Sequence, residues 1–167
     1  ALLKSKEIDA VAIASPASQH AAAAKAALLA GKDVFVEKPL ALDVKEAKAL
    51  LDLARRKKRI LMVGHILQYH PAIRKLKELV DAGELGDIQY VYSNRLNLGK
   101  IRHEENILWS FAPHDISVIL LLLGCLPKSV ATTGESWPRK GVGDVTMATL
   151  RFEKGAVAVP SDFIEVT

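Results

Sequence analysis

The chain has 167 residues, of which 50% are hydrophobic, 25% charged and 5% aromatic, with a net charge of +4. This composition is typical of a folded globular protein and excludes disordered, collagen-like and low-complexity classes. The one dense basic cluster, residues 55–59, is typical of a solvated helix end, so nucleic acid is not an expected partner. The longest apolar run, residues 118–123, is far shorter than the about 20 residues of a membrane span, so no membrane partner is expected.

The sequence contains a single cysteine, Cys125. One cysteine excludes an internal disulfide framework and is typical of a reducing compartment, which indicates a cytoplasmic protein. The apolar neighbours of Cys125 predict a buried, unreactive thiol.

The first 66 residues alternate between short apolar runs and longer helical patterns. Such apolar runs are typical of strands buried on both faces of a parallel sheet. The helical segments are an Ala-rich stretch that ends before Gly31 and an amphipathic stretch with Asp43 as the expected N-cap. The predicted strands are 10–14, 34–36 and 60–63, and the predicted helices are 20–30 and 40–58. This order predicts right-handed βαβ units in an α/β fold.

After Gly64 the pattern changes to an α+β unit with a mainly antiparallel sheet. The predicted helices are 71–82 and 113–123, the predicted strands are 88–96, 144–152 and 156–159, and residues 97–110 are expected to be irregular. Pro113 is expected near the first turn of its helix, and residues 153–155 are expected to form a hairpin turn.

Polar residues follow each of the first three predicted strands: Ser15-Pro16, Glu37-Lys38-Pro39 and Gly64-His65. Ligands of parallel sheets bind beyond the carboxyl ends of the strands, so this edge suits a nucleotide and a reacting group. A lysine beside a carboxylate can supply a proton or hold a substrate oxygen. The alternative is a surface pair before a proline turn, and spacing alone favours it.

His114 and Asp115 are expected at the start of the helix that Pro113 opens. The positive end of a helix disfavours imidazolium and would keep His114 a neutral base, whereas Asp115 would stabilise the same end. A helix-capping histidine explains His114 equally well.

Residues 94–102 contain three cations and two amides around a glycine, which suits phosphate, carboxylate or sugar recognition, although a solvated loop is an alternative. A metal site is not expected, because the histidines and acidic residues lack a tight spacing such as HxxxH. The residues considered for metal are His65, His70, His103, Glu104, Glu105 and His114.

Four segments in order, DAVAIASPASQH, GKDVFVEKPLAL, GHILQYHPAIRKL and NILWSFAPHDISVILLLLG, together resemble the Gfo/Idh/MocA family of nicotinamide-dependent oxidoreductases. The resemblance covers nearly the whole chain, and EKP after a strand is its most specific motif. It implies the C-terminal part of a Rossmann sheet in residues 1–66, followed by part of a substrate-binding and catalytic α+β domain in residues 67–167.

The resemblance also implies roles for individual residues. Lys38 and His114 are the implied catalytic pair, and the Lys38–Pro39 bond is expected to be cis. Many members have an aspartate four residues before this histidine, where this chain has Ser110. The implied cofactor, NAD or NADP, would contact Ser15, Pro16, His20, Glu37, Lys38 and His65. The implied substrate residues are Arg95, Asn97, Lys100, Arg102, Asn106 and Asp115.

The reaction that the resemblance implies is hydride transfer between the nicotinamide and a secondary alcohol of a sugar or sugar nucleotide. Family members commonly associate through the second-domain sheet, so a homo-oligomer that uses Tyr90 and Tyr92 is expected.

The family's GxGxxG fingerprint is not formed by any of the ten glycines. We therefore expect that on the order of 60 residues of the nucleotide domain, two βαβ units, lie outside this sequence. We also expect the isolated chain to bind NAD(H) poorly. The alternative is a non-catalytic binding or assembly protein derived from such an enzyme; the presence of both Lys38 and His114 favours the truncated enzyme.

Overall fold

The computed structural model describes residues 2–97, 107–135, 145–153 and 155–164. The chain divides into two compact units, Ala1–His65 and Ile66–Thr167, called here the N-terminal and C-terminal units. One contains a parallel sheet with helices and the other a mixed sheet with helices, so the predicted α/β fold class is confirmed.

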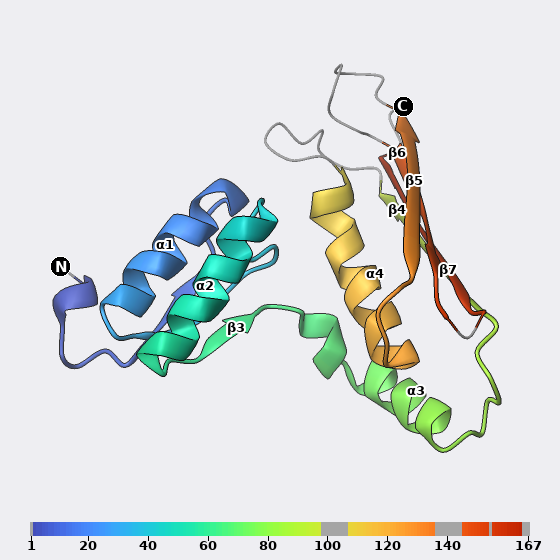
Figure 1. The fold of residues 1–167 in the computed structure, drawn as a ribbon, viewed down its shortest axis with the longest axis horizontal. Coiled ribbons are helices and arrows are strands. Elements are labelled where there is room, and N and C mark those ends of the chain that lie inside the picture. The colour runs from blue at the N-terminus through green and yellow to red at the C-terminus, as the bar shows by residue number, and fades with distance from the viewer. Residues whose placement is uncertain (1, 98–106, 136–144, 154, 165–167) are drawn as a thin grey trace. The chain divides into compact units, whose positions relative to one another are not determined.

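The N-terminal unit is a three-stranded parallel sheet in the order β1-β2-β3. Its elements are β1 (Ala10–Ile13), α1 (Ala17–Leu29), β2 (Asp33–Val36), α2 (Val44–Lys57) and β3 (Leu61–Val63), after a short 3-10 helix, Leu2–Lys4. The helices α1 and α2 pack side by side on one face of the sheet (Figure 1). The predicted order of strands and helices is therefore confirmed.

Local chemistry sets the bounds of α2. The side chain of Asp43 accepts hydrogen bonds from the backbone N–H groups of Lys45 at 2.7 Å and Glu46 at 3.1 Å. Such a cap stabilises a helix by about 1 kcal/mol. The helix begins at Val44 rather than at residue 40, because Asp43 itself has an extended backbone.

One face of this sheet packs against the helices, and the other face is partly exposed. Ile13, Val34 and Val36 pack on Leu28 and Leu50 of the helices, which forms the core. The register places Ala12, Phe35 and Met62 in one row on the opposite face, where Met62 is exposed. Within the described residues β1 is an edge strand, bonded to β2 along one side.

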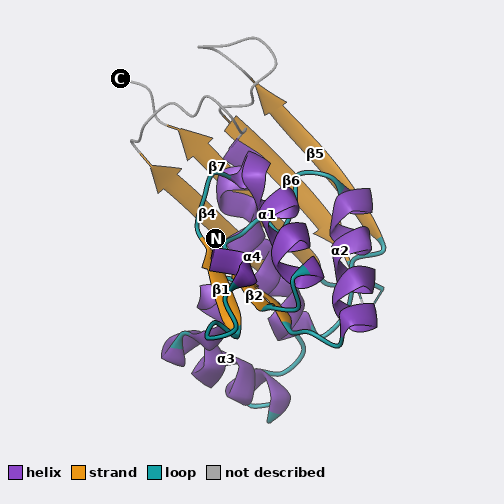
Figure 2. Ribbon diagram, turned by 90° about the vertical axis from the view of Figure 1, so that its left-hand side faces the viewer, coloured by secondary structure: helices purple, strands orange, loops and turns teal. Residues whose placement is uncertain are grey.

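The C-terminal unit is a four-stranded sheet in the order β4-β7-β6-β5, with α4 packed on one face (Figure 2). Its elements are a 3-10 helix, η2 (Ile66–Tyr69), then α3 (Pro71–Asp81), β4 (Tyr90–Asn97), α4 (Ile107–Leu123), β5 (Ser129–Glu135), β6 (Val145–Arg151) and β7 (Val157–Ile164). The β4–β7 pair is parallel and the other two pairs are antiparallel. The core forms where Ile119 of α4 meets Ala148, Leu150 and Ala158.

Two sequence predictions for this unit were wrong, and one strand was not predicted. The helix α4 begins at Ile107, so Pro113 lies inside it, at the cost of one backbone hydrogen bond. The strand β5 was not predicted, because its sequence is small and polar and all seven residues are exposed. Cys125 is exposed rather than buried, since it follows the end of α4 after Gly124.

In the described part of the chain, no helix has the length and apolar character needed to cross a membrane.

Candidate active site

The carboxyl ends of the three parallel strands lie side by side, as the sequence predicted. The backbone N–H of Glu37, just after β2, donates to the carbonyl of Ile13 at 2.9 Å. The N–H of Gly64, just after β3, donates to the carbonyl of Val36 at 2.8 Å. Residues that directly follow β1, β2 and β3 therefore share one edge of the sheet.

Glu37 and Gly64 pack closely at this edge. A carboxylate oxygen of Glu37 (Oε2) accepts a hydrogen bond from the backbone N–H of Lys38 at 3.3 Å. A Cβ atom at position 64 would lie 3.4 Å from the carboxylate carbon and 3.3 Å from the ring of Phe35. Position 64 therefore favours glycine because the Phe35 ring and the Glu37 carboxylate occupy the adjacent space. Sequence reasoning missed this role, whose signal is a glycine directly after a strand at the ligand edge.

Lys38 and His65 are both half-buried and interact electrostatically. Burial lowers the pKa of His65 below its ordinary value of 6.5, and the positive charge of Lys38 lowers it further. His65 is therefore neutral at neutral pH and keeps a nitrogen acceptor. The Lys38–Pro39 peptide bond is cis, as the family resemblance implies.

His20 lies behind this edge rather than on its surface. His20 is the fourth residue of α1, and it is 1% exposed. Its Nδ1 lies 2.7 Å from the carbonyl oxygen of Pro39, and its Nε2 lies 2.7 Å from the carbonyl oxygen of Ser15. Both ring nitrogens are engaged by the protein backbone, so neither faces a ligand.

Two buried polar atoms at the edge, Ser15 Oγ and His65 Nδ1, have no hydrogen-bond partner within the described residues. Buried polar groups are normally paired, so such atoms indicate a missing partner. A hydroxyl and an imidazole nitrogen fit the carboxamide and hydroxyl groups of a nicotinamide nucleotide. Pro16 is exposed beside them, at the N-cap position of α1. The residues present therefore fit this cofactor.

In the C-terminal unit, His114 is half-buried in the interior of α4, seven residues after its first residue. The expectation that a helix N-terminus keeps it neutral was therefore wrong, because the dipole effect is confined to the first turn. Its backbone carbonyl accepts a hydrogen bond from Ser117 Oγ at 2.8 Å. Ser110, one turn earlier, is buried.

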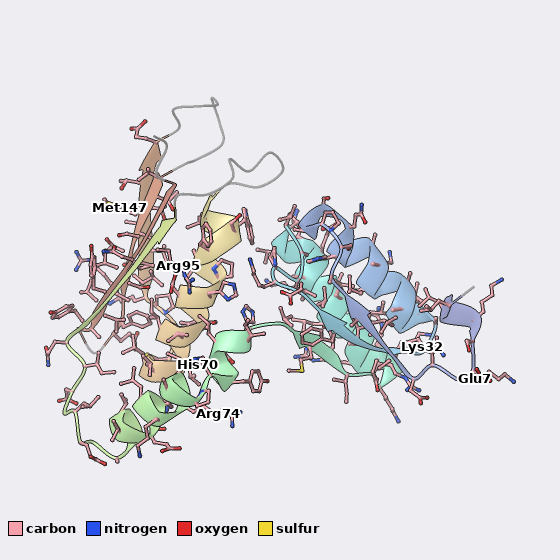
Figure 3. The ribbon with its side chains drawn as sticks, turned by 180° about the vertical axis from the view of Figure 1, so that it is seen from behind. Glu7, Lys32, His70, Arg74, Arg95 and Met147 are labelled. Atoms are coloured by element: carbon pink, nitrogen blue, oxygen red, sulfur yellow. The ribbon has the colours of Figure 1, made fainter. Side chains whose placement is uncertain are left out.

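Arg95 of β4, labelled in Figure 3, forms an ion pair with Asp115 of α4. The Nε of Arg95 donates to Oδ2 of Asp115 at 2.6 Å, and the two side chains are 30% and 11% exposed. Asp115 thus has a protein partner in addition to any substrate. Roles for both residues in substrate binding stay predictions.

The remaining predicted substrate residues are less fully described. Asn97 is the last residue of β4, and its backbone pairs in register with Ile164, the last residue of β7. Lys100, Arg102 and Asn106 lie outside the described residues, as do His103, Glu104 and Glu105. Where side chains are described, no three His, Cys, Asp or Glu residues gather as a metal site would require.

A parallel sheet with polar side chains gathered at its carboxyl edge is the arrangement in which α/β proteins bind nucleotides, which places the N-terminal unit in the class of nucleotide-binding α/β proteins. Residues 1–65 match an oxidoreductase family with an NAD-binding Rossmann fold, and residues 73–161 match the GFO/IDH/MocA C-terminal domain. The chain belongs to the Gfo/Idh/MocA oxidoreductase family. The predicted cofactor class, NAD or NADP, agrees with the family description.

Curated relatives are similar over most of this chain. It is 35% identical over 153 residues to a UDP-N-acetylglucosamine 3-dehydrogenase of Acidithiobacillus ferrooxidans. The matched segment covers 91% of this chain and 47% of the relative. It is 32% identical over 165 residues to a scyllo-inositol 2-dehydrogenase (NAD(+)) of Bacillus subtilis, covering 93% of this chain and 48% of the relative.

Solved structures of related dehydrogenases are also similar to this chain. The structure of the A. ferrooxidans UDP-N-acetylglucosamine 3-dehydrogenase matches with a TM-score of 0.84 at 34% identity, covering 95% of this chain and 50% of that one. A putative myo-inositol dehydrogenase from Sinorhizobium meliloti matches with a TM-score of 0.88 at 26% identity, covering 99% and 53%. The chain spans about half the length of the curated relatives it matches.

Proposed function

We propose that the protein is an NAD(P)-dependent dehydrogenase that oxidises a secondary alcohol of a sugar, cyclic polyol or sugar nucleotide. The observation that carries this proposal is the carboxyl edge of the parallel sheet. There Lys38 lies near His65, and two buried polar atoms have no hydrogen-bond partner among the residues that the structure describes. Family membership supports the redox chemistry. The named activities of the relatives support the substrate class.

The cofactor, when bound, supplies the acceptor for the hydride that leaves the alcohol carbon. Ser15 and His65 would bind its polar groups, and Glu37 would lie beside the reacting end. Lys38 would hold the substrate oxygen. The hydroxyl proton would pass to His114, or to Lys38 where its amine is neutral. The pairing of Lys38 with His114, and the division of roles between residues 1–66 and 67–167, belong to this proposal.

Arg95 would contribute a positive charge near the substrate, and Asp115 would hold its guanidinium in place. A positive group of this kind suits the diphosphate of a sugar nucleotide better than a neutral polyol. Lys100, Arg102, Asn97 and Asn106 would add further polar contacts.

The test is a dehydrogenase assay on the complete product of the gene, with NAD or NADP and a panel of UDP-sugars and inositols. We expect reduced cofactor to appear with at least one member of the panel. No turnover with any member, in a protein shown to bind the cofactor, would contradict the proposal.

We further propose that the 167-residue chain, taken alone, is inactive, because the GxGxxG fingerprint is not among its residues. Titration of the chain with NADH should give no saturable binding in the micromolar range. Tight binding by the chain alone would contradict this part of the proposal. The cytoplasmic location also stays a prediction.

The sheet of the C-terminal unit supports a second proposal, that two copies associate through the face opposite α4. Tyr90 and Tyr92 of β4 are 74% and 62% exposed on this face, and Met147 of β6 is exposed there too. Tyr92→Lys should shift the molecular mass measured by light scattering toward the monomer. Val130→Lys, on the opposite face of β5, is the matched control and should leave the mass unchanged.

A further inference from the structure

His20 is placed to connect two segments that are far apart in the sequence. It is almost completely buried, and its ring nitrogens lie 2.7 Å from the carbonyl oxygens of Ser15 and Pro39. Ser15 follows β1, and Pro39 follows β2 after Glu37 and Lys38. The imidazole of His20 therefore bridges the backbone segments that follow two neighbouring strands, β1 and β2.

Carbonyl oxygens only accept hydrogen bonds, so each contact needs an N–H from the ring. A neutral imidazole has one N–H and can serve one carbonyl, whereas an imidazolium has two and can serve both. A buried carbonyl that loses its donor is destabilised, because the loss of its contact with water is no longer compensated by a hydrogen bond. The ring lies against both carbonyls and can donate to at least one of them, so it links the backbone after β2 to the backbone after β1.

Lys38 lies between two fixed points of this arrangement. On one side, the N–H of Glu37 donates to Ile13 in continuation of the sheet. On the other side, the carbonyl of Pro39 contacts His20. Because Pro39 directly follows Lys38, a displacement of its carbonyl moves the backbone from which the lysine side chain projects.

The geometry points to His20 as a positioning residue: its imidazole fixes the backbone at Pro39 relative to Ser15 and thereby sets where the Lys38 amine lies. This inference relies on the proposed function only for the catalytic importance of Lys38. The placement of Lys38 by His20 can be measured without any activity.

The first experiment measures the pKa of His65 by NMR titration in the 167-residue chain. Lys38 lowers that pKa, so it reports where the lysine charge lies. His20→Phe keeps a ring but removes both donors, and should raise the pKa of His65 by part of the amount that Lys38→Met raises it. Lys25→Met, which removes an exposed charge from the same helix, is the control and should leave it unchanged.

A purely structural role for His20 predicts a different result. The urea midpoint of His20→Phe would then fall while the pKa of His65 in the folded protein stayed at the wild-type value, which would overturn the inference. If His20→Phe does not fold, His20→Gln decides the question, because its amide can donate to one carbonyl. That variant should show a smaller rise in the same pKa, and no rise would overturn the inference.

The second experiment uses the complete gene product. Misplacement of a reacting group by about 1 Å can cost on the order of 100-fold in rate. We expect His20→Phe to lower kcat about 10- to 100-fold, with partial recovery in His20→Gln and a nearly unchanged KM for the nicotinamide cofactor. If His20→Phe left kcat unchanged but raised the pKa of His65, the proposed role of Lys38 would be contradicted. The inference that His20 positions Lys38 would still hold.

Discussion

The guanidinium of Arg95 on β4 donates to the carboxylate of Asp115 on α4 at 2.6 Å. The pair lies beyond the apolar core of the C-terminal unit, one turn of α4 before Ile119. It joins a sheet strand to the helix that carries His114. The rotation of α4 about its own axis is thereby linked to the sheet, which also sets the direction of the neighbouring histidine.

Loss of this ion pair should destabilise the C-terminal unit. Removing one partner from a fully buried pair costs about 3–5 kcal/mol, but Arg95 is partly exposed and solvent screens the charge. We therefore expect Asp115→Asn to lower the free energy of unfolding in urea by about 1–2 kcal/mol. Lys75→Met removes one partner of the exposed Lys75–Glu78 pair and should cost less than about 0.5 kcal/mol. Equal losses in the two variants would contradict this account.

Lys38→Met should raise the pKa of His65. The lysine charge is one of two causes of the lowered value, and burial, the larger cause, remains in the variant. The pKa should therefore rise but stay below 6.5 in an NMR titration of the ring protons. Lys45→Met, at an exposed position in the first turn of α2, should have no effect. An unchanged pKa of His65 in Lys38→Met would show that the side chains of Lys38 and His65 do not lie close together.

The stability of the N-terminal unit should decrease in mild acid. The pKa of His65 is lower in the folded chain than its ordinary value of 6.5, so the unfolded chain binds the proton first as the pH falls. Stability is then fully present above pH 6.5 and is lost progressively as the pH falls toward the lowered folded value. Urea midpoints measured from about pH 7.5 to about pH 5 should fall less in His65→Gln than in the wild type. Parallel curves would exclude His65 as the group responsible.

Gly64→Ala should displace the Glu37 side chain. The new methyl group would lie 3.3 Å from the Phe35 ring and 3.4 Å from the Glu37 carboxylate, so a neighbour must move by a few tenths of an ångström. Overpacking of this kind costs about 1–3 kcal/mol, and we expect about 1 kcal/mol because the Glu37 side chain can shift. In the Glu37→Ala background the same change should cost less, which a double-mutant cycle in urea measures. Additive losses would show that the two positions do not interact.

Lys38→Ala and His114→Asn should each lower the turnover of the complete gene product. General acid–base groups contribute about 10²- to 10⁴-fold, so we expect losses in that range with little change in folding. The loss in His114→Asn should be partly recovered at high pH if the histidine removes the hydroxyl proton. Lys45→Ala is the control for loss of a surface charge. Unchanged turnover in Lys38→Ala would remove the lysine from the mechanism.

The sequence predicted the parts of the fold that local patterns determine. The short apolar runs of β1 and β2, the cap at Asp43 and the EKP segment all have strong local signals, and their order predicted the parallel sheet. The expectation that these strands are buried on both faces was wrong, because the helices cover one face and leave Ala10 and Ala12 exposed on the other. The three strand ends were expected at one edge because parallel strands share their direction. The same reasoning predicts that Lys38 and His65 lie at one edge, in agreement with their electrostatic interaction.

Features that depend on tertiary contacts were not predictable. The strand β5 has no hydrophobic alternation and forms because β6 pairs with it along its whole length. Pro113 is a typical helix start by itself, but α4 begins six residues before it, which the local proline signal does not predict. The contacts of His20 with Ser15 and Pro39 involve backbone carbonyls, which carry no sequence signal at all.

Among the residues that the structure describes, β1 lies at the edge of its sheet, and this position has a consequence for handling the protein. A strand bonded along one side offers its other side as a template for further pairing, and natural edges are usually protected by lysine, proline or a bulge. The sequence AVAI of β1 contains no such protection, and its alanines at positions 10 and 12 are exposed. A preparation of the described chain at high concentration should therefore form intermolecular β-structure, with an exposed strand of one molecule extending the sheet of the next.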